Sequence, residues 1–348
     1  MLTRLFINNF TVFREAEIRL SRGLNVIVGE NASGKSHLLK LCYTICNSVA
    51  ETSKRPMTKE TIERYIAEKL VKVFRPDNLG RLATRVWGKS HCEVEAFFGR
   101  RPGIHIAFSF STGSTRKVKL DGISVRTPPK ETLFIPPKEV LTIYPGFAAA
   151  IENRELEFDD TYYDLCKNLD VRPLKGPRMR KIASILNPIE NIMKGKVCLE
   201  KNNRFYFSSE GKGLLEVTLL AEGFNKVGML SYLLRNGSLV KNGILLWDEP
   251  EANLNPKLLK QVAEAICTLV ANNIQVIIAT HSLFLMRELH ILSNEYSLQR
   301  LFSALVIDDD DGLVKIHQDS DIDNLPKIVA LEEEVGQSDR YLSLPLEG

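Results

Sequence analysis

The chain has 348 residues, of which 44% are hydrophobic, 26% charged and 8% aromatic, the composition of an ordinary globular protein. No stretch approaches the roughly 18 consecutive apolar residues that a membrane span needs, and the alternating start Met1–Phe10 lacks the features of a signal peptide. The six cysteines form no Cys-x-x-Cys pair, so neither a zinc site nor a disulfide framework is indicated. We therefore expect a cytoplasmic protein with no membrane partner, built as two domains or as one domain with an insertion.

The net charge of +3 conceals an uneven distribution. Residues 51–90 carry ten basic side chains against five acidic ones, whereas residues 308–348 carry twelve acidic against three basic. A further group of five cations would suit nucleic acid or an acidic partner, although the prolines and glycine beside them equally fit a solvated loop. This basic cluster comprises Arg172, Lys175, Arg178, Arg180 and Lys181.

The first third of the chain mixes strand and helix patterns. Apolar alternation predicts strands over 2–8 and 16–20, a buried strand over 24–28, and a further strand over 132–135. Helical spacing predicts a helix after Ser36 and a second over 58–74. Between them we expect an antiparallel part, whose strands are 92–98, 103–110 and 115–125, with a hairpin turn at 111–114.

The remainder is helical and then alternates between helix and strand. Residues 139–192 carry a helical pattern broken by prolines, which we interpret as a helical insertion, and a hairpin follows at 197–200 and 204–208. The alternation beyond it predicts a parallel sheet covered by helices. The expected elements are a helix from 222, a strand at 244–247, a helix at 256–271, a strand at 274–279, a helix at 283–292, and strands at 303–307 and 313–317.

The strongest motif is Gly29-Glu-Asn-Ala-Ser-Gly-Lys-Ser36, a full match to G-x-x-x-x-G-K-[ST] between an apolar strand and a periodic helix. Backbone N–H groups of such a loop and the helix N-terminus bind phosphates. Lys35 would reach the β and γ phosphates, and the Ser36 hydroxyl would ligate Mg²⁺. The expected nucleotide contacts are Gly29, Glu30, Asn31, Ala32, Ser33, Gly34, Lys35, Ser36 and His37.

A second motif, Ile244-Leu-Leu-Trp-Asp-Glu-Pro-Glu251, places acids at the end of a buried strand, where ligands bind in open α/β sheets. Asp248 would hold Mg²⁺, and Glu249 would orient and deprotonate a water molecule. His281 follows another buried strand, so its imidazole can reach the γ-phosphate. A small-residue turn around Gly223 opens a helix, which fits either an anion site or a simple N-cap.

Together these motifs resemble the ABC-class ATPases of the SMC and RecF type, within the broad AAA group of bacterial ATP-binding proteins. Gly29–Ser36 is similar to their Walker A loop, Leu245–Glu249 to Walker B with its catalytic glutamate, and Ala252–Pro256 to the D-loop. His281 is similar to the switch histidine, and Ala221–Lys226, the signature segment, lies where the family has its signature. The similarity covers roughly 1–40 and 215–285.

The resemblance implies an α/β P-loop NTPase of the ABC-ATPase head type, with an antiparallel β subdomain and a helical insertion. It implies that ATP and Mg²⁺ bind between two copies of the chain, with Gly223 acting in trans, and that catalysis involves Glu249 and His281. Two departures predict slow or partner-dependent turnover: the signature segment lacks a Ser-Gly-Gly core, and Glu139 is the nearest polar residue to the position of the Q-loop glutamine. The implied division is 1–138 and 196–330 as ATPase lobes, 139–195 as the insertion, and 331–348 as an acidic tail.

Several functions remain open. A chromosome machine would need a long coiled coil, and the weak signature disfavours a transporter subunit. The favoured hypothesis is a homodimer, or a higher oligomer, that regulates a separate nuclease or toxin in a bacterial defence-type module. The alternatives are an ATP-gated scaffold and a repair ATPase that acts on DNA.

Two acidic segments remain outside these motifs. The acids at 308–311 are expected to form a hairpin turn rather than a metal cluster. Residues 331–341 are expected to form a short exposed helix, which is either a solvated tail or a docking element for a basic partner.

Overall fold

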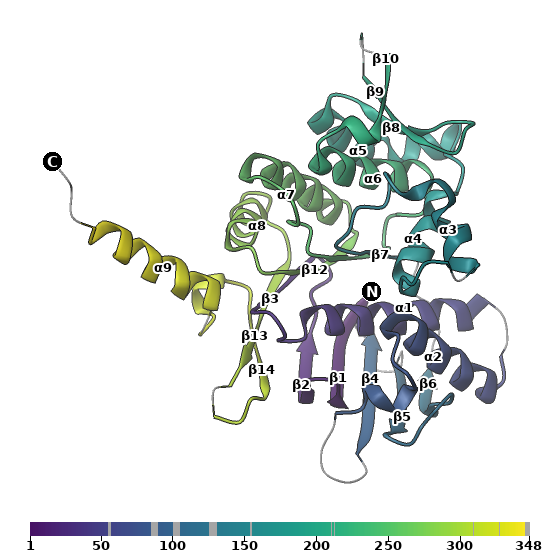
Figure 1. Cartoon of the computed structure of the whole chain (residues 1–348), viewed down its shortest axis with the longest axis vertical. Coiled ribbons are helices and arrows are strands. Elements are labelled where there is room, and N and C mark those ends of the chain that lie inside the picture. Colours follow the sequence, from purple (N-terminus) through teal and green to yellow (C-terminus); the bar gives the residue numbers. More distant parts are fainter. Residues whose placement is uncertain are drawn as a thin grey trace.

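The computed structural model shows a central sheet, a second antiparallel sheet and a helical region with a small third sheet (Figure 1). The ends of two expected strands, residues 103–104 and 125, lie outside the described residues, as does Asp309. The structure describes residues 1–54, 57–84, 90–99, 105–124, 131–153, 155–209, 211, 213–308, 310–326 and 328–344.

The central sheet has the strand order β14-β13-β3-β12-β11-β7. Strands β13, β3, β12, β11 and β7 run parallel, and β14 pairs antiparallel with β13 at one edge. Because β12 lies between β3 and β11, the carboxyl ends of these three strands meet at one edge of the sheet. The strands are β3 (Leu24–Gly29), β7 (Thr132–Ile135), β11 (Ile244–Asp248), β12 (Gln275–Thr280), β13 (Arg300–Ile307) and β14 (Val314–Asp319).

One face of the central sheet packs on α1 (Lys35–Lys54), and α1 also packs on α2 (Lys59–Phe74). A single hydrophobic cluster joins these helices to the inner face of an antiparallel sheet with the order β2-β1-β4-β5-β6. The expected antiparallel part is therefore confirmed. Its strands are β1 (Leu2–Phe10), β2 (Phe13–Arg19), β4 (His91–Phe98), β5 (His105–Ser111) and β6 (Lys119–Ser124), with the 3₁₀ turn η1 (Leu79–Leu82) beside them.

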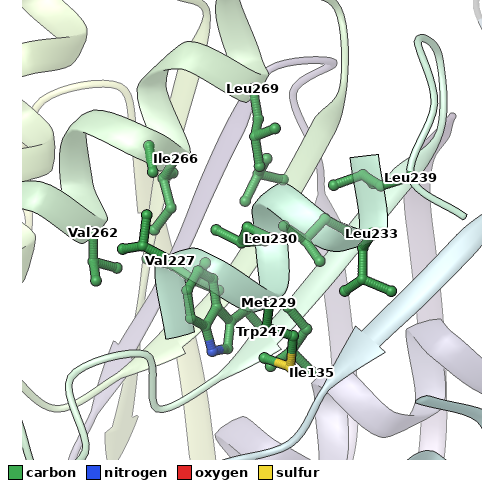
Figure 2. Packing of buried hydrophobic residues seen from close by; sticks show 14 of the residues in the cluster. Ile135, Val227, Met229, Leu230, Leu233, Leu239, Trp247, Val262, Ile266 and Leu269 are labelled. Carbon is green, nitrogen blue, oxygen red and sulfur yellow. The ribbon is translucent and has the colours of Figure 1, made fainter. Parts of the chain in front are cut away.

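The opposite face of the central sheet is covered by α6 (Glu222–Arg235), α7 (Pro256–Ala271) and α8 (Leu283–Glu295). Figure 2 shows the indole of Trp247, a fully buried residue of β11, among side chains of α6 and α7. The sheet is thus covered on both faces, which explains why its central strands β3, β11 and β12 are almost continuously apolar.

The region 139–195 is helical, as expected, and its helices share one core with α6 and α7. Its elements are α3 (Tyr144–Glu152), α4 (Asp160–Leu169) and α5 (Pro177–Met193). The expected hairpin is β8 (Lys196–Leu199) and β9 (Phe205–Ser209). Strand β10 (Gly213–Glu216) was not predicted from the sequence, because all four of its residues are exposed and show no alternation. The turn η2 (Val217–Leu219) follows β10. The boundaries proposed for the domains stay a prediction.

The acidic end of the chain forms a hairpin and then a helix. Asp308, Asp310 and Asp311 lie in the β13–β14 turn, where the Gly312 amide donates to the Asp308 carbonyl at 2.9 Å, so the expected hairpin turn is confirmed. Among the described residues, no group of His, Cys, Asp and Glu is arranged to hold a metal ion. After the turn η3 (Ile322–Asn324), α9 (Val329–Leu342) projects from the body and buries none of its residues, as expected for an exposed helix (Figure 1).

No helix in the described part of the chain is long and apolar enough to cross a membrane.

A buried carboxamide fastens the start of the chain to the central sheet. Gln275 Oε1 accepts a hydrogen bond from the Leu2 amide at 3.0 Å, while Nε2 donates to the carbonyls of Leu2 and Ser21, both at 2.7 Å. Gln275 is fully buried, so water cannot replace these bonds.

We expect Gln275→Leu to lower the free energy of unfolding by about 2–4 kcal/mol, because it leaves buried backbone groups of Leu2 without partners. Urea unfolding followed by fluorescence measures the change. The matched control is Gln299→Leu at an exposed position, with an expected change within about 0.5 kcal/mol. Equal stability of the two variants would contradict the role of Gln275.

Candidate nucleotide site

The loop Gly29–Ser36 connects β3 to α1 at the carboxyl edge of the central sheet. Gly34 has a φ of +91°, and a Cβ atom there would lie 2.5 Å from Val12 Cγ2 and 2.9 Å from Phe13 Cζ. Glycine is therefore required both by the backbone conformation and by the β1–β2 turn that packs on the loop. Ala32, with a φ of +67°, adopts a left-handed conformation without being glycine, so the loop holds local backbone strain.

The ammonium group of Lys35 lies over this loop. Its Nζ donates to the Gly29 carbonyl at 2.7 Å and to the Glu30 carbonyl at 2.8 Å. Burial lowers the pKa of Lys35, while the nearby carboxylates of Glu249 and Asp248 oppose that shift. A buried cation held by its own loop fits a site for anionic phosphates, because a phosphate offers it a stronger partner than carbonyl oxygens do.

Ser36 and Asp248 bring two oxygen atoms together across the edge of the sheet. Ser36 Oγ donates to Asp248 Oδ1 at 3.1 Å, from the first turn of α1 to the end of β11. Burial raises the pKa of Asp248 to about 6, and the Glu249 charge adds to the shift, whereas the Ser36 hydrogen bond opposes it. A half-buried hydroxyl beside a buried carboxylate with too little positive charge next to it fits Mg²⁺, which prefers oxygen ligands.

Glu249 lies directly beyond this pair. Its φ is +47°, a strained conformation for glutamate, and its amide donates to the Ala279 carbonyl at 2.9 Å. The side chain is about one third exposed, with Oε1 4.0 Å from His281 Nδ1. The strained turn at the end of β11 therefore directs a carboxylate toward the end of β12, next to the imidazole that the sequence predicted.

Glu251 belongs to the acidic motif, but no role was predicted for it from the sequence. Its Oε1 accepts hydrogen bonds from Thr280 Oγ1 at 2.7 Å and from the His281 amide at 2.9 Å, and it lies 3.3 Å from His281 Nδ1. Its Oε2 is buried without a hydrogen-bond partner. Glu251 thus fixes the backbone and the ring of His281. The available signal was a third acid three residues after Asp248.

The signature segment contacts the same turn from the other side. Lys226 is 1% exposed, and its Nζ donates to the carbonyls of Pro250 at 3.2 Å and Ala252 at 2.8 Å. Gly223 is buried against α7, since a Cβ atom there would lie 2.8 Å from Leu258 Cδ1. Within one chain, Gly223 therefore allows α6 to pack closely on α7, and its action in trans stays a prediction. The N-cap residue of α6, Ala221, provides no side-chain cap.

Two other candidates, His37 and Glu139, have local contacts of their own. The exposed ring of His37 packs edge-on against Phe74 of α2, with centroids 5.7 Å apart. The Glu139 carboxylate accepts hydrogen bonds from the amides of Leu141 and Thr142, and burial raises its pKa. Glu139 therefore caps the turn that leads into α3.

The fold and the site define a P-loop protein of the ABC-type ATPase head class. One edge of the parallel sheet carries a phosphate loop, an oxygen pair for a cation, a carboxylate and an imidazole, and an antiparallel β part packs beside that sheet. The chain belongs to the AAA family described as "AAA domain, putative AbiEii toxin, Type IV TA system", whose model matches residues 24–287. This membership confirms the resemblance to SMC- and RecF-like ATPases and implies that the chain binds a nucleotide.

Solved structures support the same fold. An SMC head bound to the C-winged helix domain of ScpA covers 92% of this chain, and the chain covers 98% of that head, with a TM-score of 0.57 and 14% identity. An SMC head domain with an extended coiled coil from Pyrococcus furiosus, bound to the C-terminal domain of ScpA, matches over 98% and 99% with a TM-score of 0.53 and 14% identity. At this identity the likeness establishes the fold alone.

Short stretches also match two DNA-repair proteins. Over 46 residues the chain is 48% identical to DNA repair protein RecN of Haemophilus influenzae, and over 55 residues it is 42% identical to DNA replication and repair protein RecF of Salmonella paratyphi B. The matches cover 12% and 16% of this chain, and only 8% and 15% of those proteins.

We expect Asp248→Asn to stabilise the protein, free of metal and nucleotide, by roughly 1–3 kcal/mol at pH 7.5. The pKa of Asp248 is about 6 in the folded protein, above the usual 3.8, so the folded state binds the proton more tightly than the unfolded state does. The contribution of Asp248 to the free energy of unfolding therefore falls as the pH rises from 4 to 6. The advantage of the variant should therefore vanish near pH 4. Denaturant unfolding of both proteins from pH 4 to 8 measures it, and a constant difference across that range would contradict the assignment.

Proposed function

We propose that this protein binds and hydrolyses ATP with Mg²⁺, and that ATP-dependent head-to-head dimerisation regulates a separate effector protein. The observation that carries the proposal is the convergence of Lys35, the Ser36–Asp248 pair, Glu249 and His281 at the ends of three adjacent strands. Each residue then has one task in phosphoryl transfer.

The loop amides and Lys35 hold the β and γ phosphates, while Ser36 and Asp248 would hold Mg²⁺, which neutralises charge on the phosphates when bound. Glu249 orients a water molecule and accepts its proton. The imidazole of His281 faces the γ-phosphate and is held there by Glu251. The pairing of Nδ1 with Glu251 leaves Nε2 available for the phosphate.

A second copy of the chain completes the site. The uncapped N-terminus of α6 offers amide groups to an anion, and Gly223 brings that helix end toward ATP held by Lys35 of the other copy. Support for partners comes from the similar SMC heads, which were solved with domains of ScpA. The family description, which names a toxin system, supports an effector of the nuclease or toxin type in a defence module.

Turnover by the isolated protein should be slow. The signature segment has no Ser-Gly-Gly core, and Glu139, the nearest polar residue to the Q-loop glutamine position, is a carboxylate that accepts hydrogen bonds from its own turn. We infer that the effector or its trigger accelerates hydrolysis.

We expect Glu249→Gln to reduce ATP turnover at least 100-fold while ATP still drives dimerisation, because the variant retains the phosphate and metal contacts but loses the base. Phosphate release and sedimentation velocity measure the two properties.

Lys35→Ala, which leaves the fold intact, should abolish nucleotide binding.

Two outcomes would contradict this proposal. Equal and negligible turnover in wild type and Glu249→Gln, with ATP-dependent dimers in both, would favour the ATP-gated scaffold. Unchanged ATP affinity in Lys35→Ala would show that the loop does not bind the phosphates.

The second candidate function is a repair ATPase that acts directly on DNA. The RecF and RecN matches support it, and the basic cluster is fully exposed, at the α4–α5 connection and the first turn of α5. A helix N-terminus that carries cations is suited to phosphate groups.

If DNA binds there, neutralising Arg178, Arg180 and Lys181 together should weaken binding and reduce the salt-dependence slope by about 2–3, since each lost phosphate contact contributes about 0.9. Fluorescence anisotropy at several salt concentrations measures the slope. The control is neutralisation of the exposed α2 cations Lys59, Arg64 and Lys72. Identical slopes in the two triple variants would exclude the basic cluster as a DNA site.

A further inference from the structure

Helix α4 of the helical region meets α1 and α2 through charged side chains. Lys69 of α2, whose side chain is 7% exposed, binds Asp160 at 2.7 Å and Asp164 at 2.5 Å. Tyr43 of α1 donates a hydrogen bond to Asp164 at 2.5 Å. The apolar side of α4 packs elsewhere, in the cluster that it shares with α6 and α7, whereas α1 and α2 belong to the second cluster. The contact between α4 and the helix that follows the phosphate loop is therefore largely polar.

One ion pair of this contact lies a single helical turn from the proposed metal ligands. Lys40 of α1 binds Asp159, which precedes α4, with Nζ 2.8 Å from Oδ2, and the two side chains are 22% and 14% exposed. Because Lys40 follows Ser36 by four residues, both side chains lie on the same side of α1. Burial raises the pKa of Asp248, and the Lys40 charge opposes that rise. The ammonium group is therefore close enough to act on the carboxylate that pairs with Ser36.

Asp159 is itself fixed at the start of α4. Its Oδ1 accepts hydrogen bonds from the Thr161 amide at 2.9 Å and from the Thr161 hydroxyl, as an N-cap residue does. Its other oxygen, Oδ2, binds Lys40. The Lys40 ammonium is therefore held by a carboxylate whose position is set by α4.

Without Asp159, the Lys40 ammonium has a second carboxylate to bind. A lysine ammonium is a compact charge on a flexible four-carbon stem. Asp248 is 2% exposed and accepts a hydrogen bond from the neutral hydroxyl of Ser36. A released ammonium would pair with this buried carboxylate. It would then compete with Mg²⁺ for the carboxylate oxygens and repel the charge of the metal.

We propose that Asp159 is a positioning residue for the metal site, because it holds the Lys40 ammonium away from Asp248 and so leaves Ser36 and Asp248 open to Mg²⁺. This inference rests on the proposed binding of ATP with Mg²⁺ at that pair. Asp159 acts through Lys40 and is not itself a ligand. A displacement of α4 from α1 releases the lysine, so the helical region takes part in metal binding without supplying a ligand.

The effect of Mg²⁺ on nucleotide affinity tests this role. The probe is a fluorescent, non-hydrolysable ATP analogue, whose Kd is measured by anisotropy in EDTA and in saturating Mg²⁺. We call the ratio of the two Kd values the magnesium gain. Asp159→Asn retains the cap, because asparagine caps helices as well as aspartate does, but it removes the charge. We expect this variant to reduce the magnesium gain at least about fivefold, since the released cation opposes the metal.

A second substitution distinguishes the charge of Asp159 from a structural role. When Lys40→Gln is added to Asp159→Asn, the competing ammonium is gone, so the magnesium gain should return to within about twofold of wild type. Lys40→Gln alone should not reduce the gain. A structural role predicts no such rescue, because the second substitution removes another contact between α1 and α4. Binding in EDTA shows that each variant retains its phosphate loop.

The matched control frees a different lysine of the same helix. Glu51 binds Lys54 at 2.5 Å in the last turn of α1, far along the helix from Ser36. Glu51→Gln should leave the magnesium gain unchanged, because the lysine that it frees is too distant to reach Asp248.

Two results would overturn the positioning role. One is an equal magnesium gain in wild type and Asp159→Asn, and the other is an equal loss in Asp159→Asn and the double variant. Both leave the proposed function in place, provided that Mg²⁺ strengthens binding to wild type. Absence of nucleotide binding by wild type, or of any magnesium gain, would overturn the proposed function together with this inference.

Discussion

The site depends on one constraint: β12 lies between β3 and β11, and all three strands run parallel. In this register Val28 pairs with Thr280, and Asp248 with Ala279. The loop Gly29–Ser36, the acidic turn and His281 therefore emerge side by side, although more than 200 residues separate the loop from the other two in sequence. Because parallel strands are hydrogen-bonded on both sides and covered by helices on both faces, these three ends are held more rigidly than loops alone could hold them.

The turn at residues 250–252 is fixed from two directions. Lys226 binds its carbonyl oxygens from α6, and Glu251 binds Thr280 and His281 at the end of β12. The same turn therefore links α6, the helix proposed to meet the other copy's nucleotide, to the imidazole of His281 through hydrogen bonds. Buried polar contacts of this kind have few alternative arrangements, which favours concerted movement over gradual deformation.

Much of the architecture could be predicted because the hydrophobic periodicity and the phosphate-loop motif indicated the same order of strands and helices. The buried strands 24–28, 244–247 and 274–279 were recognisable from their apolar runs, and the phosphate loop from its eight residues. What the sequence could not show was contact between distant polar residues. Lys226 and Glu251 look like surface charges in sequence, and only the folded chain reveals that both are buried, Lys226 against the carbonyls of Pro250 and Ala252 and Glu251 against the end of β12. Strand β10 was missed because exposed residues carry no alternation, and nothing in the sequence indicated that Gly223 packs closely against Leu258 of α7.

The pairing of β3 also governs the order in which the molecule can form. Its two neighbours are β12 and β13, which lie at the far end of the sequence. During synthesis, the loop that follows β3 emerges early, but β3 has no neighbouring strand until residues 275–280 have left the ribosome, and it has both neighbours only after residues 300–307 have followed. The nascent chain therefore has no preformed phosphate-binding loop for most of its elongation, and the high sequence separation of these contacts favours slow, late acquisition of nucleotide binding.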